Sequence, residues 1–314
     1  MTTQQQQHQP ILIVGAGELG TSVLEAIAAH PKRDAARSPV SVLLRKSTIE
    51  SADPAKRASN ERLRALGAAE LVPGDVVGES EEELADTFRR FHTVVVCTGM
   101  GLPAGTQLRI ARAALAAGVP RLLPWQWGVD YDAVGPGSAQ DLFDEQLAVR
   151  QLLRGQEATD WAVVSVGLFM SFLFEPAFGA VDLARRTARG LGGWDTPVTA
   201  TAVRDIGRVA AEVVCDPRDA HRRVVYAGGD TLTYGRVAEL VEKRFGGPWK
   251  REEWPLDLLK KKAQENPDDA MVKYQIVFGA GKGVAWDLAG TINRQRGMQM
   301  QTVEDYLAEM QDLE

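Results

Sequence analysis

Three glycines near the beginning of the chain have the spacing of a nucleotide-binding turn. Gly15, Gly17 and Gly20 form the pattern G-x-G-x-x-G directly after the apolar run ILIV. The first glycine allows a tight turn, the second lets a pyrophosphate approach the backbone, and the third lets the next helix pack on the strand. The N–H groups at the start of that helix would face the phosphates. A glycine-rich turn without a ligand is the alternative, but the flanking strand and helix patterns favour a dinucleotide site that includes Glu18 and Leu19.

Cations follow the second predicted strand, where a dinucleotide site usually carries an acidic residue. The apolar residues 40–44 indicate a strand, and Arg45, Lys46 and Ser47 come directly after it. In an NAD site, an Asp or Glu near this position binds the ribose 2′-hydroxyl. A cation would instead attract a 2′-phosphate, which arginine can bind through two parallel hydrogen bonds. The sequence therefore favours NADP(H) over NAD(H) as the cofactor, and the alternative is a solvated strand end.

A second loop of small residues is predicted beside the glycine turn. The apolar run VVVC indicates a buried strand, and Thr98, Gly99 and Met100 follow it. In a doubly wound sheet the carboxyl ends of neighbouring strands meet at one edge, where small residues leave room for a cofactor. We therefore expect these three residues to contact the dinucleotide.

Aromatic side chains follow two later strands, where a substrate could bind. Segment 121–130 is predicted to be a strand, and period-two alternation then directs Gln126, assigned to the cofactor, away from the tryptophans on either side of it. Indole and phenyl faces suit a flat aromatic substrate, although such side chains also pack well in a core. The predicted pocket comprises Trp125, Trp127, Phe169, Met170 and Phe172.

Reduction also requires a proton donor, for which Tyr131 is a candidate close to the tryptophans in sequence. A phenol is protonated at neutral pH and can polarise a carbonyl or imine. Asp130 and Asp132 flank it, water or a substrate group could deliver the proton instead, and Tyr131 could be an exposed loop residue. The Tyr-x-x-x-Lys pair of ordinary short-chain dehydrogenases is absent from the sequence.

Strand and helix patterns alternate through the first half of the chain, which predicts an α/β fold with a doubly wound parallel sheet. We expect this NAD(P)-binding Rossmann domain over residues 10–165, after a disordered tail of residues 1–9. Residues 166–314 are expected to form a smaller, mostly helical substrate-binding part, packed on the first domain and partly interleaved with it. Its helices are predicted near 203–214, 233–245, 255–265 and 302–312, with short strands near 197–200 and 223–226.

Composition argues against several other classes of protein. The net charge is −6 and the basic residues are dispersed, so a nucleic-acid-binding face is not expected. No stretch has the length and apolarity of a membrane span, and the start of the chain lacks an apolar signal region. Two cysteines and four histidines without ligand spacing predict no metal site. We expect a cytoplasmic protein that binds a small-molecule substrate, as a monomer or a homodimer.

The ordered set of motifs resembles the isoflavone reductase and NmrA-like group of atypical short-chain dehydrogenases. The glycine turn and Arg45 match this group, as do Gly74-Asp75, LLPWQWG at 122–128, VRQLL at 149–153, Asp205-Ile206-Gly207, Asp216-Pro217-Arg218 and Thr302-Val303-Glu304-Asp305-Tyr306-Leu307. The resemblance implies an NADP-dependent Rossmann fold with a small C-terminal substrate-binding part. It also implies the reduction of small aromatic or heterocyclic secondary metabolites.

The chain departs from the plant reductases of this group in the region that the chemistry would use. Leu123-Pro124-Trp125-Gln126-Trp127-Gly128 stands where they have Phe-Pro-Ser-Glu-Phe-Gly, and the lysine near their nicotinamide aligns with Gln146. Glutamine is neither an acid nor a base at neutral pH, although Gln146 could orient a substrate through hydrogen bonds.

Three functions are consistent with these sequence features. The leading hypothesis is an NADPH-dependent reductase that transfers a hydride from nicotinamide C4 to a carbonyl, imine or related carbon. The second is an NmrA-type regulator that senses NADP(H) without catalysis, which the missing lysine favours. The third is an isomerase or cyclase that uses bound NADP(H) as a scaffold.

Overall fold

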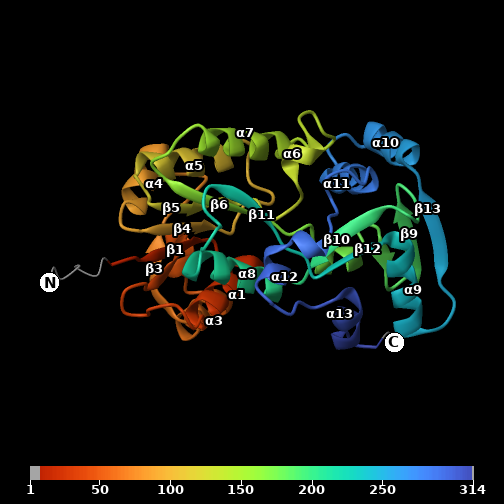
Figure 1. Cartoon of the computed structure of the whole chain (residues 1–314), viewed down its shortest axis with the longest axis horizontal. Helices are drawn as coiled ribbons and strands as arrows, with labels where there is room; N and C mark the ends of the chain where they lie inside the picture. The colour runs from red at the N-terminus through yellow and green to blue at the C-terminus, as the bar shows by residue number, and fades with distance from the viewer. Residues whose placement is uncertain (1–7, 313–314) are drawn as a thin grey trace. The chain divides into compact units, whose positions relative to one another are not determined.

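The computed structural model describes residues 8–312, which form two units (Figure 1). The first unit comprises the chain up to Gln126 together with Ala148–Val164 and Ile206–Val225. The second comprises Trp127–Leu147, Ser165–Asp205 and the chain from Tyr226 onward. The chain passes between the two units several times. The predicted disordered tail lies outside the described residues except for residues 8 and 9, of which Gln9 donates its N–H to Arg37 O (2.7 Å).

A seven-stranded sheet forms the centre of the first unit, in the order β11-β6-β5-β4-β1-β2-β3. The neighbouring pairs from β6 to β3 run parallel. All four residues of β1 are buried, as expected for an apolar strand covered on both faces. The predicted doubly wound parallel sheet is confirmed. Its strands are β1 (Ile11–Val14), β2 (Val40–Leu44), β3 (Ala68–Pro73), β4 (Thr93–Val96), β5 (Arg121–Leu123), β6 (Asp160–Ser165) and β11 (Arg223–Tyr226).

Helices cover both faces of this sheet. In Figure 1, α4 and α5 lie on one face, and α1, α3 and α8 lie on the other. Local signals explain several helix ends, since α4 begins with a capping box in which Ser80 and Glu83 bond to each other's backbone N–H groups. The helices are α1 (Glu18–Ala28), α2 (Lys46–Ile49), α3 (Pro54–Ala65), α4 (Glu81–Phe88), α5 (Thr106–Ala116), α7 (Leu142–Arg154) and α8 (Val203–Cys215).

The second unit contains two three-stranded sheets in addition to its helices. Their orders are β12-β10-β7 and β13-β9-β8. The strands are β7 (Leu168–Phe169), β8 (Val181–Asp182), β9 (Thr187–Leu191), β10 (Pro197–Thr201), β12 (Asp230–Thr233) and β13 (Lys250–Trp254). The helices are α6 (Tyr131–Val134), α9 (Tyr234–Phe245), α10 (Leu256–Glu265), α11 (Ala270–Gly279), α12 (Ile292–Gln295) and α13 (Val303–Glu309), with 3₁₀ turns at Met170–Phe174 and Leu288–Gly290.

The predicted elements of the second half are present, and one of them, a strand, belongs to a different part of the molecule than predicted. The four predicted helices correspond to α8, α9, α10 and α13, and the strand near 197–200 is β10. The strand near 223–226 is β11, which belongs to the large sheet rather than to the smaller part. Helix α11 was not predicted, because its apolar residues are not confined to one stripe. No helix within residues 8–312 combines the length and the apolar composition that a membrane span requires.

The ends of β1 and β4 lie side by side at the point where the order of strands along the sheet reverses. From β1 the chain continues to β2 and β3, and it then returns to β4 on the other side of β1. The register pairs Val14 with Val96, so the loops that follow these residues are neighbours. Ligands of doubly wound sheets bind at such a switch point. The fold thus brings together the two loops of small residues that follow β1 and β4.

A glycine sets the contact between α8 and α1 in the first unit. A Cβ on Gly207 would lie 2.3 Å from Ser22 Oγ and 2.6 Å from Ser22 O. We expect Gly207→Ala to lower the free energy of unfolding by about 1–3 kcal/mol, because the two helices must separate to admit the methyl group. Urea denaturation measures this change. The matched control is Gly290→Ala, whose Cβ would have no atom within 4 Å, and equal midpoints for the two variants would contradict the close contact.

Candidate functional site

The three glycines of the turn differ in how closely their surroundings approach them. Gly15 adopts a φ of +97°, and a Cβ there would lie 2.8 Å from Thr98 Cβ. A Cβ on Gly20 would lie 2.0 Å from Gly15 O, so α1 passes very close to the end of β1. A Cβ on Gly17, in contrast, would have no atom within 4 Å. The backbone at Gly17 is therefore open to a ligand while its two neighbours are closely packed.

A hollow of about 470 Å³ lies beside this turn, within the first unit. Its volume is in the range of pockets that hold small molecules and cofactors. The glycine turn, the end of β2, helix α3 and the loops after β3 and β4 all contribute to it. Polar and small lining residues include Gly15, Gly17, Arg45, Thr48, Ser59, Asn60, Gly74, Asp75 and Thr98.

Arg45 lies at the edge of this hollow with its charge available. It precedes the single turn of α2, and its carbonyl accepts hydrogen bonds from Thr48 N–H (2.8 Å) and Ile49 N–H (3.2 Å). Asn60 is buried and donates to the carbonyls of Thr48 (3.0 Å) and Ile49 (3.3 Å), so it holds α2 in place. Among residues 8–312, no carboxylate forms an ion pair with Arg45. A rigid turn therefore presents an exposed guanidinium to the hollow.

Eight of the twelve residues predicted to bind the cofactor lie outside the lining, namely Glu18, Leu19, Gly20, Lys46, Ser47, Gly99, Met100 and Gln126. Lys46 is exposed, with Nζ 3.8 Å from Glu50 Oε1, and Ser47 is also exposed. Glu18 is exposed and Leu19 is buried against the core. Their roles stay predictions. Sequence reasoning did not select Ser59, Asn60 and Asp75 as site residues, although the Gly74-Asp75 pair was a signal that could have found the last of them.

The loop after β4 is held from two sides. Gln107, at the start of α5, donates its side-chain amide to Thr98 O (3.1 Å). A Cβ on Gly99 would lie 2.0 Å from Cδ2 of Trp125, so the indole lies directly against the loop backbone. Met100 is 52% exposed, which leaves its side chain free of the core. Gly99 is therefore required for the packing of Trp125, whatever contact it makes with a cofactor.

The structure corrects the predicted strand around the two tryptophans. β5 ends at Leu123, because Pro124 has no N–H to continue the ladder and its carbonyl accepts from Gln126 N–H (2.8 Å) in a tight turn. Period-two alternation therefore does not apply to Trp125 and Trp127. Trp125 belongs to the first unit and Trp127, which is 6% exposed, to the second. Their predicted roles in substrate binding remain predictions without the argument of a shared strand face.

Gln126 is completely buried and held by an arginine that sequence reasoning did not select. Its Oε1 accepts from Arg150 Nε (2.8 Å), and Arg150 is also completely buried. Arg150 lies in α7 four residues after Gln146, which places both side chains on one face of that helix. The VRQLL motif was the available signal for Arg150. The side-chain amide of Gln126, the last residue of the first segment of this unit, is thus held in a fixed position.

Tyr131 and Gln146 both lie in the interior of the protein. Tyr131 is 4% exposed, so the alternative of an exposed loop tyrosine is wrong. Its ring meets Phe143 edge to face with 4.9 Å between centroids, and a Cβ on Gly128 would lie 2.7 Å from its hydroxyl oxygen. Gln146 is completely buried in α7. The proposed chemical roles of Tyr131 and Gln146 stay predictions.

The aromatic run after β6 divides between core and partly exposed positions. Met170 is completely buried in the hydrophobic core of the second unit, as the core-packing alternative expects. Phe169 and Phe172 are partly buried. Of the three, Phe169 and Phe172 therefore keep surface that a substrate could contact.

A tyrosine and a carboxylate that sequence reasoning did not pair are joined in the second unit. Tyr226, at the end of β11, donates its hydroxyl to Asp130 Oδ2 (2.8 Å), and its ring meets Trp286 edge to face. Asp130 also caps α6 by accepting from Ala133 N–H (3.3 Å). The two residues are 96 positions apart, so no local pattern could have shown the pair.

No group of three or more metal-ligating side chains occurs within residues 8–312. Both cysteines are free thiols, and burial raises the pKa of Cys97 far above its usual range and that of Cys215 to about 11. Both are therefore protonated and weakly nucleophilic at neutral pH.

Comparison with known proteins agrees with this fold. The NmrA-like family model matches residues 7–307. The chain belongs to the NmrA-like family. An NmrA-like family domain-containing oxidoreductase of Gibberella moniliformis is 50% identical over 301 residues, covering 96% of this chain and 97% of its own.

Similar proteins of lower sequence identity include plant proteins that are named as reductases or reductase homologs. The isoflavone reductase homolog IRL of Zea mays is 27% identical over 272 residues, 82% of this chain and 81% of its own. The structure of leucoanthocyanidin reductase with NADPH from Vitis vinifera superposes with a TM-score of 0.77 at 22% identity, covering 96% of this chain and 98% of that one. The resemblance predicted from the sequence is confirmed at the level of the family.

The glycine turn allows a paired test of packing against openness. We expect Gly20→Ala to lower the free energy of unfolding by about 1–3 kcal/mol, because its Cβ would overlap Gly15 O. Gly17→Ala should cost less than about 1 kcal/mol, since its Cβ enters open space. Thermal denaturation of both variants measures the difference. A Gly17 variant as unstable as the Gly20 variant would show that the turn is not open at Gly17.

Proposed function

We propose that the protein is an oxidoreductase that uses NADPH to reduce a small aromatic or heterocyclic metabolite at a carbonyl, imine or related carbon. When bound, NADPH supplies the hydride from nicotinamide C4. The chain itself binds and orients the dinucleotide and the substrate. The observation that carries the proposal is the hollow at the switch point, where Gly17 is open and Arg45 carries an available charge.

The residues around this hollow fit a phosphorylated dinucleotide. The start of α1 at Glu18 directs backbone N–H groups toward the turn, which suits a pyrophosphate beside Gly17. Arg45 lies where the 2′-phosphate of NADP(H) would distinguish it from NAD(H), and Thr48 and Ser59 add hydroxyl groups. The NADPH complex of leucoanthocyanidin reductase, which has the same fold, supports this assignment.

Aromatic residues support a flat substrate. Trp127, Phe169 and Phe172 belong to the second unit, and we assign them to substrate binding through their ring faces. Trp125 and Met170 are the weaker members of the predicted pocket, because Trp125 packs on Gly99 and Met170 is buried in the core.

The proton must reach the product without a lysine at position 146. Gln146 holds no titratable proton, and we assign it to orienting the substrate through its amide. We assign Tyr131 as the proton donor, since its phenol is protonated at neutral pH.

A regulator that senses NADP(H) is the second candidate, and Gln146 is the observation that favours it. Such a protein would bind the cofactor at the same hollow and would require a protein partner. An isomerase or cyclase with NADP(H) as scaffold would form product without net consumption of the cofactor. Measuring cofactor consumption and product formation together separates the three functions.

The cofactor assignment is tested by Arg45→Ala beside Lys46→Ala. We expect Arg45→Ala to weaken NADPH binding roughly tenfold or more and to leave NADH binding almost unchanged, because a charged hydrogen bond to the 2′-phosphate is lost. Lys46→Ala removes a neighbouring cation that lies outside the lining and should keep the preference for NADPH. Fluorescence titration with both cofactors measures the affinities. An Arg45 variant that keeps its preference would refute the assignment.

The proton-donor assignment is tested by Tyr131→Phe beside Tyr274→Phe. Both rings pack edge to face on Phe143, so the two variants disturb the same aromatic cluster to a similar extent. We expect only Tyr131→Phe to lower kcat, by about 10² or more, because it alone removes the acid. Equal rates for both variants would assign the proton to water or to the substrate.

A further inference from the structure

A second hollow of about 470 Å³ lies in the first unit, at the opposite end of the strands from the glycine turn. β1, β4, β5 and β6 begin side by side, with Ile11 opposite Thr93, Thr93 opposite Arg121, and Arg121 opposite Asp160. All four residues line the hollow. The glycine turn follows the other end of β1, so this hollow is separate from the cofactor site and has no part in the proposed reduction.

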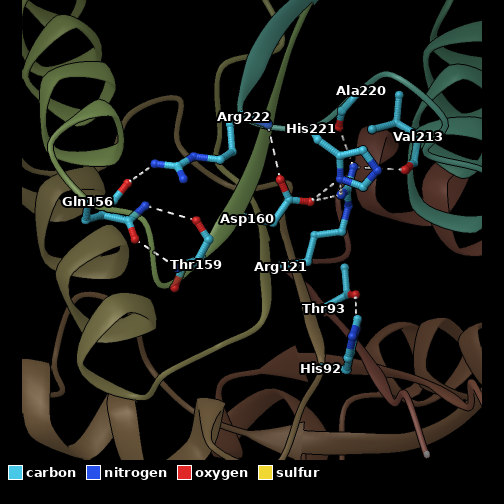
Figure 2. Close-up of polar contacts among 10 residues, drawn as sticks. All are labelled: His92, Thr93, Arg121, Gln156, Thr159, Asp160, Val213, Ala220, His221 and Arg222. Carbon is cyan, nitrogen blue, oxygen red and sulfur yellow. Dashed lines mark hydrogen bonds and ion pairs between the residues drawn. The ribbon is translucent and has the colours of Figure 1, made fainter.

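Arg121 is an enclosed cation in the wall of this hollow. Its side chain is 6% exposed, and its Nη2 donates to Val213 O (3.2 Å) and Ala220 O (2.7 Å). Its Nη1 forms an ion pair with Asp160 (Figure 2). Two carbonyls and one carboxylate thus hold the guanidinium in a fixed position, in surroundings that screen its charge poorly.

Asp160 has little accepting capacity left for a ligand. Besides Arg121, its carboxylate accepts from Arg222 N–H (3.1 Å) and lies 2.9 Å from His221 Nδ1. Figure 2 shows these donors converging on the carboxylate from β5 and from the segment before β11. The hydrogen-bonding capacity of the Asp160 carboxylate is therefore largely used by groups of the protein itself.

The other charged groups of the lining are mostly cations. Lys32, Arg33 and Arg37 add to Arg121, whereas the remaining acid is Asp34, whose Oδ1 accepts from the N–H groups of Ala36 (3.1 Å) and Arg37 (3.2 Å). The buried Nε atoms of Arg33 and Arg121 have no acceptor within residues 8–312. Lys32 Nζ bonds to Asp216 (2.6 Å), and its side chain is 55% exposed, which leaves donors for a ligand. The charged residues of the lining are therefore four cations and two acids, besides the histidines.

Two imidazoles complete the lining. His92 is half-buried, with Nδ1 2.9 Å from Thr93 Oγ1 (Figure 2). The side chain of His221 is 51% exposed. Burial, together with the charge of Arg121, lowers the pKa of His92 below its usual range.

We propose that this hollow binds a small anion-bearing molecule, through a phosphate or carboxylate group, at a second site that lies at the end of the strands opposite the glycine turn. Lys32 and His221 lie at exposed positions where they can donate to the anion directly. The cations of the lining outnumber its acids, and this excess of positive charge attracts the anion.

The proposal is tested by titrating the full chain with inorganic phosphate and, separately, with citrate at constant ionic strength, with chloride as the reference. The imidazole NMR signals of His92 and His221 report on this hollow and not on the glycine turn. We expect saturable shifts with at least one anion. The anion that binds more tightly identifies phosphate or carboxylate as the recognised group. Adding NADPH should not abolish these shifts, because the cofactor site is separate from this hollow.

Matched lysine variants locate the binding. Lys32→Ala should weaken anion binding about fivefold, which is the scale of one exposed ion pair. Lys243→Ala removes another exposed lysine, bonded to Glu304 in the second unit, and should leave the affinity unchanged. Shifts that do not saturate, that disappear when NADPH is added, or that are identical in the two variants would overturn the proposal.

Discussion

The close passage of α1 over the end of β1 is the constraint on which the cofactor half of the molecule depends. Gly20 allows it, because any side chain there would overlap Gly15 O. The same approach forces Gly15 into a left-handed conformation against Thr98 and leaves the backbone at Gly17 open. The start of α1, the loop after β4 and Arg45 after β2 consequently surround one hollow at the switch point of the sheet. Three glycines thus determine where a dinucleotide can bind.

The region that distinguishes this chain from the plant reductases begins where β5 is interrupted. Pro124 ends the strand, and the next three residues serve different structures: Trp125 packs on Gly99, Gln126 is anchored by Arg150, and Trp127 enters the second unit. Within one fold, function is determined by the residues of a site, so differences in this region are compatible with a shared cofactor-binding fold.

The sequence was sufficient for the elements whose signals are local. Apolar runs and the glycine spacing predicted the large sheet and the position of Arg45. It was insufficient where distant segments meet: β11 joins the large sheet although it lies far along the chain, and Tyr226 meets Asp130 across 96 residues. The tryptophan alternation failed for a local reason, since a proline interrupts the ladder that the argument required. Burial of Tyr131 and Arg150 likewise follows from tertiary packing and has no signature in spacing.

If hydride passes from a cofactor bound at the glycine turn to a small aromatic or heterocyclic substrate, a label on nicotinamide C4 must appear in the product. NADPH deuterated at both C4 positions is supplied to the protein with a panel of aromatic carbonyls, imines and benzylic ethers, and the products are analysed by mass spectrometry. We expect a reduced product that carries the deuterium. Tight NADPH binding with no deuterium transferred to any member of the panel would contradict it and favour a sensing role.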